Sequence, residues 1–171
     1  MNDDLPERMH PLDLGARFDR RSNHAAVQRH SLAVLLIKLD GFVPMNAGHG
    51  GAAGEAVQRI VAAALAQTAG TEKLLSALAS GEFACLLSGL PTREQLSLLA
   101  WRLLDALGAP MRVGVISLAL RPSIGIARWP ADGTGYQALL RNAGAAMYRA
   151  RNQKSGFAFF DAFADVWEHD A

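Results

Sequence analysis

The feature that most constrains the fold is a single apolar run, SLAVLLIKL, at residues 31–39. Its length and its branched residues are typical of a central strand buried on both faces. The uninterrupted apolar part, Leu32–Ile37, is much too short to cross a bilayer. The run therefore predicts a sheet whose central strand is covered by helices.

Helical and strand patterns are interleaved along the rest of the chain. We expect helices over 13–29, 52–67, 92–107 and 136–152, and strands over 73–78, 82–87, 111–120, 122–129 and 157–160. Thr92 is the expected N-cap of the third helix, and Met147 and Tyr148 are expected in the core. This order predicts an α+β fold with a central, largely antiparallel sheet flanked by helices.

Length and composition fit one domain with an ordinary globular core. The chain has 171 residues and a formal net charge of +1, and no basic stripe appears, so nucleic acid is not an expected partner. The single cysteine, Cys85, lies in an apolar strand and is expected to be a buried, inert thiol in a reducing compartment. The start, MNDDLPERMHP, has no apolar signal core, so we expect a cytoplasmic protein without membrane contact.

Four blocks in one order resemble the GGDEF domain of diguanylate cyclases. They are LAVLLIKLDGFVPMNAGHGGAAGE for the family's DLDxFKxIND…GHxxGD, ALASGEFACLL for RxGGDEFxxLL, RPSIGIARWPADG for SxGIAxxPxDG, and LLRNAGAAMYRAR for LLxxADxAMYxAK. The resemblance covers about residues 10–161 and implies the palm-like fold of nucleotide cyclases. It gives a domain at 13–161 between linkers at 1–12 and 162–171, the second of which is compatible with a further domain. In the family, two such domains each hold one GTP and condense them to cyclic di-GMP.

The family's two metal-binding carboxylates are replaced in this sequence. The resemblance places Lys38 at the first position and Gly81 at the second. An ammonium has no lone pair for a divalent cation and glycine has no side chain, whereas such cations require carboxylate oxygens. Asp40 and Glu82 remain nearby, but neither is expected to restore the site. We therefore predict no catalytic residue, no metal, no cofactor and no cyclase activity.

Part of a vestigial GTP pocket is implied by the resemblance. Asn46 and Glu55 stand at the guanine-binding positions, and Lys38 and Arg151 are candidate phosphate ligands. The alternative is that Asn46 caps a turn and that Glu55 is a solvated residue of the first helical turn. Lys38 itself should pair with a carboxylate, Asp40 or Glu82, or else with a phosphate; the carboxylate is the preferred partner.

The tip of the hairpin also departs from the family pattern. Ala79 adds a methyl group where a phosphate would approach, while Ser80–Gly81 can still form a tight turn with Gly81 in the left-handed conformation. The inhibitory motif RxxD would need Arg at 70 and Asp at 73, where the chain has Gly70 and Lys73. No inhibitory cyclic di-GMP site is expected on that surface.

These observations predict a degenerate, inactive GGDEF domain that serves as a regulatory or protein-interaction module in bacterial cyclic di-GMP signalling. Its expected partner is a protein of that pathway, for example an EAL-type domain in the same chain. The alternative is a metal-independent GTP-sensing domain that regulates a neighbouring EAL-type domain. A third reading is a working cyclase that uses a displaced carboxylate, Asp40 or Glu82.

Overall fold

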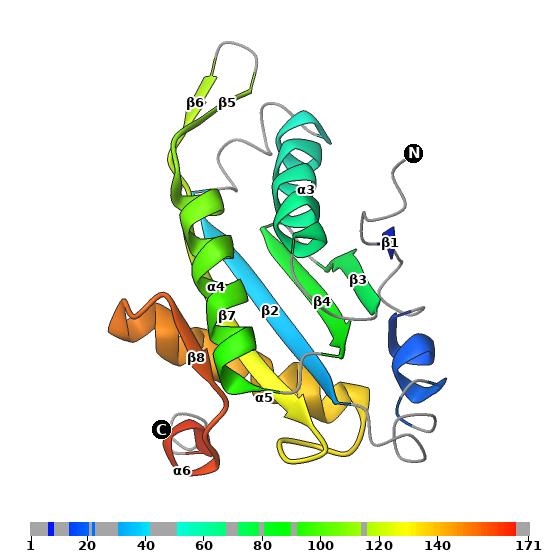
Figure 1. Cartoon of the computed structure of the whole chain (residues 1–171). Helices are drawn as coiled ribbons and strands as arrows, with labels where there is room; N and C mark the ends of the chain where they lie inside the picture. The colour runs from blue at the N-terminus through cyan, green and yellow to red at the C-terminus, as the bar shows by residue number, and fades with distance from the viewer. Residues whose placement is uncertain are drawn as a thin grey trace.

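The chain folds around one six-stranded sheet, in the order β1-β3-β4-β2-β7-β8 (Figure 1). The computed structural model describes residues 7–8, 14–20, 22, 31–41, 51–67, 72–78, 81–89, 92–113 and 116–166. The strands are β1 (Glu7–Arg8), β2 (Leu32–Asp40), β3 (Glu72–Ala77), β4 (Glu82–Ser88), β7 (Arg121–Trp129) and β8 (Phe157–Phe159). The three inner pairings are antiparallel and the two outer ones are parallel. A separate hairpin joins β5 (Met111–Val113) and β6 (Ile116–Leu118).

Helices cover both faces of this sheet. They are α3 (Gly51–Ala66), α4 (Arg93–Gly108), α5 (Tyr136–Gln153) and the short α6 (Ala162–Val166), and residues 14–20 are also helical. α3 and α4 pack on one face, and α5 with residues 14–20 packs on the other. The expected α+β fold, a largely antiparallel sheet between helices, is confirmed.

The central strand β2 is buried on both faces, as its continuous apolar run predicts. Leu35 and Ile37 point into the core beneath α3 and α4, whereas Val34 and Leu36 point toward α5. Each is at most 7% exposed, and burying one such side chain contributes about 1.5–3 kcal/mol. Residues 32–37 are covered on both sides and have no solvent-facing position, so this part of the sequence shows no alternation.

The expected N-cap of α4 is confirmed. The Thr92 hydroxyl accepts a hydrogen bond from the Gln95 backbone N–H at 3.1 Å, and the Gln95 side-chain oxygen accepts one from the Thr92 N–H at 3.4 Å. This reciprocal pair satisfies two backbone donors that the first turn leaves free.

α5 lies unusually close to β7 at Gly125. A Cβ placed on Gly125 would lie 2.5 Å from the Met147 backbone nitrogen and 2.9 Å from the Ala143 carbonyl carbon, and still closer to the Ala143 oxygen. The absence of a side chain at this one position allows the helix to rest on the strand.

Only one of the two adjacent residues expected in the core is buried. Met147 is fully buried in the cluster between α5 and the sheet, but Tyr148 is 43% exposed. Successive helical residues are turned by about 100°, so two neighbours rarely face the same core. The expectation for Tyr148 was therefore wrong.

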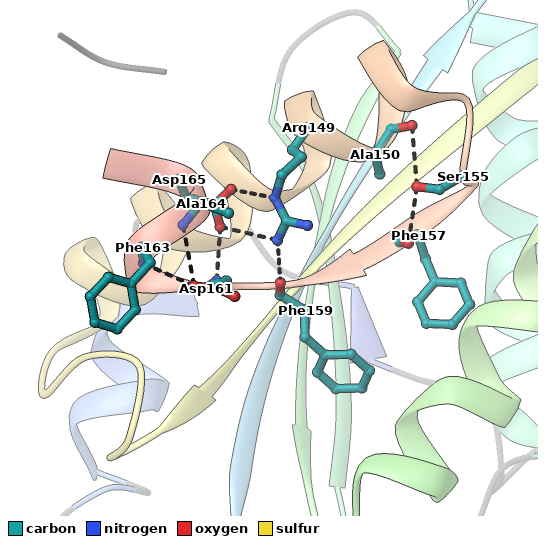
Figure 2. A network of polar contacts seen from close by, with 9 residues as sticks. All are labelled: Arg149, Ala150, Ser155, Phe157, Phe159, Asp161, Phe163, Ala164 and Asp165. Atoms are coloured by element: carbon teal, nitrogen blue, oxygen red, sulfur yellow. Dashed lines mark hydrogen bonds and ion pairs between the residues drawn. The ribbon is translucent and has the colours of Figure 1, made fainter. Parts of the chain in front are cut away.

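The short helix α6 is held against α5 by one ion pair (Figure 2). Arg149 Nε donates to Asp165 Oδ1 at 2.6 Å, and Arg149 Nη2 donates to the Phe159 carbonyl oxygen at 2.7 Å. The Asp165 carboxylate is fully buried and also accepts the Asp161 backbone N–H at 2.9 Å. These contacts join residues 162–166, which sequence analysis assigns to the C-terminal linker, to the end of the sheet.

The edge strand β8 has its outward carbonyl oxygens occupied. On its inner side the strand and its flanking residues are hydrogen-bonded to β7: the Ile124 N–H donates to the Gly156 oxygen, and the Phe160 N–H donates to the Ile126 oxygen. The alternate carbonyls face away from β7: that of Phe159 accepts from Arg149, and that of Phe157 accepts from the Ser155 hydroxyl at 3.4 Å. Side chains thus cover this edge of the sheet.

Candidate functional site

A half-buried ion pair occupies the corner where β2 ends and β4 begins. The register aligns Lys38 with Glu82, and the Lys38 ammonium lies 3.2 Å from the Glu82 carboxylate. The two side chains are 23% and 24% exposed. Of the partners that sequence analysis offered Lys38, the structure shows the carboxylate of Glu82.

Gly81 closes the hairpin beside this pair. It adopts φ 76°, the left-handed conformation expected for it, and its carbonyl oxygen accepts the Leu39 N–H at 2.8 Å. Ala79 and Ser80, which complete the turn, lie outside the described residues. Glycine is favoured here because an L side chain in this conformation would be strained.

The described residues of this corner do not fit a divalent cation. A cation there needs carboxylate oxygens free to coordinate it. The Glu82 carboxylate is bound to the Lys38 ammonium, and Gly81 supplies no ligand. The nearest other carboxylate, that of Asp40, accepts a hydrogen bond from Arg151 Nε at 2.8 Å. Each carboxylate described at this end of β2 is thus already neutralised by a cation of the protein.

Arg151, the second candidate phosphate ligand, reaches this end of β2 from the last turn of α5. Its hydrogen bond to Asp40 raises the pKa of the guanidinium further, and the Asp40 charge acts in the same direction. The structure therefore brings two of the four predicted pocket residues, Lys38 and Arg151, to the same strand end. There they are paired with Glu82 and Asp40.

The two candidate guanine ligands are not brought together by the described residues. Glu55 is exposed on α3, and Asn46 lies outside the described residues, so the guanine pocket stays a prediction. The alternative correctly expected Glu55 to be exposed to solvent, but it placed Glu55 in the first helical turn. α3 begins at Gly51 and carries no acidic residue in its first turn. Of the absent inhibitory motif, Lys73 is described in β3, whereas Gly70 is not.

An open cleft of about 1000 Å³ adjoins this strand end, and sequence analysis missed it. Trp101 and Leu104 of α4 form one wall, and Arg121 and Lys154 contribute cations from β7 and from the turn after α5. These residues are far apart in the chain and match no motif. One signal was available: Arg151, the candidate phosphate ligand, also lines the cleft.

Cys85 belongs to the core rather than to any site. The thiol is fully buried, and burial raises its pKa to about 12. A thiol that stays protonated at neutral pH is a poor nucleophile, so the expected burial of Cys85 is confirmed and its inertness stays a prediction.

The described part of the chain shows neither a helix able to span a membrane nor a cluster of side chains able to bind a metal ion. None of its helices has both the length and the apolar character that crossing a membrane requires. The same residues hold no group of three or more His, Cys, Asp or Glu side chains that could bind a metal ion.

Comparison with known proteins places the chain in a known family. Residues 12–156 match the model of the diguanylate cyclase GGDEF domain, so the chain belongs to the GGDEF family. It is 28% identical over 163 residues to the bifunctional diguanylate cyclase/cyclic di-GMP phosphodiesterase MucR of Pseudomonas aeruginosa, covering 95% of this chain and 24% of that protein. It is 31% identical over 152 residues to the cyclic di-GMP phosphodiesterase PdeR of Escherichia coli, covering 89% and 22%.

A solved structure of the family has the same architecture. The GGDEF domain of TpbB from Pseudomonas aeruginosa superposes with a TM-score of 0.81 at 27% identity, covering 98% of this chain and 96% of that one. The chain therefore matches a whole GGDEF domain. It spans about a quarter of the length of MucR and PdeR.

Proposed function

We propose that this chain is a catalytically inactive GGDEF domain that acts as a regulatory or protein-interaction module in cyclic di-GMP signalling. The observation that carries the proposal is the Lys38–Glu82 ion pair at the corner where β2 ends and β4 begins, the place of the metal ions in the family. In the family's chemistry, cations there would lower the pKa of the attacking hydroxyl and neutralise the leaving pyrophosphate. A lysine fixed on the neighbouring carboxylate supplies a single charge and no coordination site.

The family context supports the regulatory part of the proposal. MucR and PdeR carry phosphodiesterase activity in their names, and each is several times longer than this chain. We propose that this domain likewise acts on a protein partner of the same pathway, such as an EAL-type phosphodiesterase domain. Cytoplasmic location is part of this proposal, because cyclic di-GMP, the signal of the pathway, is made from GTP, a nucleotide of the cytoplasm.

A metal-independent GTP sensor is the alternative function. It needs Lys38 and Arg151 for phosphates, but each already holds a carboxylate of this chain at 3.2 Å or less. A triphosphate would have to break two ion pairs to bind, and losing them would offset part of its own affinity. We therefore rank the sensor below the interaction module.

The proposal is tested by product formation from GTP. The purified domain, incubated with GTP and magnesium or manganese, should yield no cyclic di-GMP by chromatography, while the active GGEEF domain of a diguanylate cyclase from Vibrio cholerae serves as the positive control. Loss of a catalytic metal site removes several kcal/mol of transition-state stabilisation, so the rate should fall by several orders of magnitude. Product that disappears in Asp40→Ala would contradict the proposal and favour a displaced carboxylate.

A binding measurement separates the module from the sensor. Isothermal titration of the domain with GTP, without metal, should show no heat of binding. GTP binding that is lost in both Lys38→Met and Arg151→Met would instead support the sensor.

A further inference from the structure

The open cleft lies where β7 runs beyond the end of β8. Pairing between these strands starts at Ile124 and Phe157, so residues 121–123 of β7 have no strand on their outer side. Pro122 faces this gap and has no N–H to offer there. The pairing of β7 with β2 does not need this N–H. At the Leu39–Pro122 pair, the Leu39 N–H points toward β4 and donates to the Gly81 oxygen. An occupant of the cleft therefore has to be held by side chains rather than by an added β-strand.

An exposed aromatic ring forms one wall of the cleft. Trp101 is 53% exposed, and its indole packs edge-to-face on Phe157, with ring centroids 5.2 Å apart at 85°. Leu98, one turn earlier on the same face of α4, is also 53% exposed. The apolar surface thus extends from the cleft along the helix, beyond what a small ligand in the cleft would cover. Tryptophans held rigidly in this way are frequent anchors of protein interfaces.

Two cations on the cleft have no ion-pair partner among the described residues. Arg121 and Lys154 are both exposed, whereas the neighbouring Arg151 is neutralised by Asp40. Lys154 is moreover held at φ 54° and ψ 36°, a left-handed conformation that favours glycine. Lys154 is the C-cap of α5, where helices commonly end with a glycine in this conformation, so a lysine here carries a conformational cost that a glycine would avoid.

We propose that this cleft docks an acidic protein segment with an apolar anchor. The anchor packs on Trp101, Leu104 and Pro122, and carboxylates flanking it pair with Arg121 and Lys154. This inference rests on the proposed function, because it names the surface through which an interaction module would act. A failure of one is distinguishable from a failure of the other, since turnover of GTP and binding of a peptide are separate measurements.

The test uses a defined peptide and matched variants. The probe is fluorescein-labelled EEDLFEDEE, followed by fluorescence anisotropy at low ionic strength; we expect a dissociation constant of roughly 100 µM or tighter. Lys154→Glu should weaken binding about tenfold or more, whereas Arg141→Glu, the same charge change on an exposed residue away from the cleft, should change it less than about twofold. Trp101→Ala should also weaken binding about tenfold, and Phe163→Ala, which truncates an 85% exposed aromatic on α6, should not.

One variant separates docking from any loss of folding. Lys154→Gly removes the cation and relieves the left-handed strain, so it should raise the melting temperature while weakening peptide binding. The proposal is overturned if the unmutated domain does not bind the peptide, or if Lys154→Glu and Trp101→Ala bind it as tightly as the unmutated domain does. The peptide EEDSSEDEE lacks the apolar anchor. If it binds as tightly as EEDLFEDEE, the site recognises negative charge alone, and the proposal is overturned in favour of a small anion. A Trp101-dependent dimer in sedimentation, without peptide binding, overturns it in favour of a second copy of the chain.

Discussion

Replacing Gly125 by alanine should destabilise the domain strongly, because a Cβ there would meet the backbone of α5. The new Cβ would lie 2.5 Å from the Met147 nitrogen and 2.9 Å from the Ala143 carbonyl carbon, where non-bonded atoms normally pack at about 3.5–4.0 Å. The obstacles are backbone atoms of α5 and cannot rotate away. The helix would therefore have to retreat by roughly 1 Å or more, loosening the buried contacts of its inner face.

Overpacking a core costs about 1–3 kcal/mol, and a clash with backbone belongs at the upper end. We expect a loss of about 3 kcal/mol in the free energy of unfolding, measured by urea denaturation followed by circular dichroism. For a domain of this size the melting temperature should fall by roughly 6–12 °C.

Gly144→Ala is the matched control on the opposite side of the same interface. A Cβ at Gly144 meets only the Leu36 side chain, at 3.4 Å, and alanine is favoured over glycine within a helix by about 1 kcal/mol. This variant should be neutral or stabilised by up to about 1 kcal/mol. The reasoning is refuted if Gly125→Ala costs less than about 1 kcal/mol, or if both variants lose stability equally.

Three further predictions concern ionisable side chains that are buried or paired. Lys38→Met leaves a half-buried carboxylate unpaired and should cost about 1 kcal/mol or more in thermal melting, with no GTP-dependent shift in either form; a GTP-dependent rise present only in the unmutated protein would favour the sensor. Asp165→Asn leaves the Arg149 guanidinium without its buried counter-charge and should cost about 3 kcal/mol, whereas the exposed Asp105→Asn should change stability by less than about 0.5 kcal/mol; equal losses would contradict the role of the pair. Cys85 should not react with a thiol reagent at pH 8 in the folded state, and because its folded pKa of about 12 exceeds the unfolded value, its contribution to stability should be lost as pH rises from 9 toward 12. Alkaline unfolding unchanged in Cys85→Ala would contradict that assignment.

The secondary structure could be predicted largely because local patterns and tertiary packing agree here. The run at 31–39 becomes the central strand, and Thr92 caps α4 through Gln95. The error at Tyr148 has a simple cause, since an apolar residue beside a buried one was given the same helix face.

The candidate site could be predicted only in part. Sequence analysis left Lys38 with two candidate carboxylates or a phosphate as its partner, and the cross-strand register places Glu82 opposite it. Asp40 is instead bound by Arg151, which lies 111 positions away in the chain. Local spacing contains no information about such a contact, because it depends on how the end of α5 meets the end of β2.

The cleft and the α6 contacts could not be predicted for the same reason. Trp101 and Lys154 belong to separate elements and share no spacing. Asp165 looked like one more acidic residue of a polar tail, yet its carboxylate is fully buried against Arg149. Only the packed structure distinguishes a structural carboxylate from a solvated one.

The covered edge of β8 has a consequence for how the domain behaves when concentrated. A strand from another molecule that approached this edge would find the Phe159 carbonyl already held by Arg149 at 2.7 Å, and the Phe157 carbonyl held by Ser155. Joining it would mean displacing a guanidinium that is itself fixed by Asp165. We therefore expect addition of a strand from another molecule to be disfavoured at this edge, so that Arg149 should hinder aggregation as well as stabilise the fold.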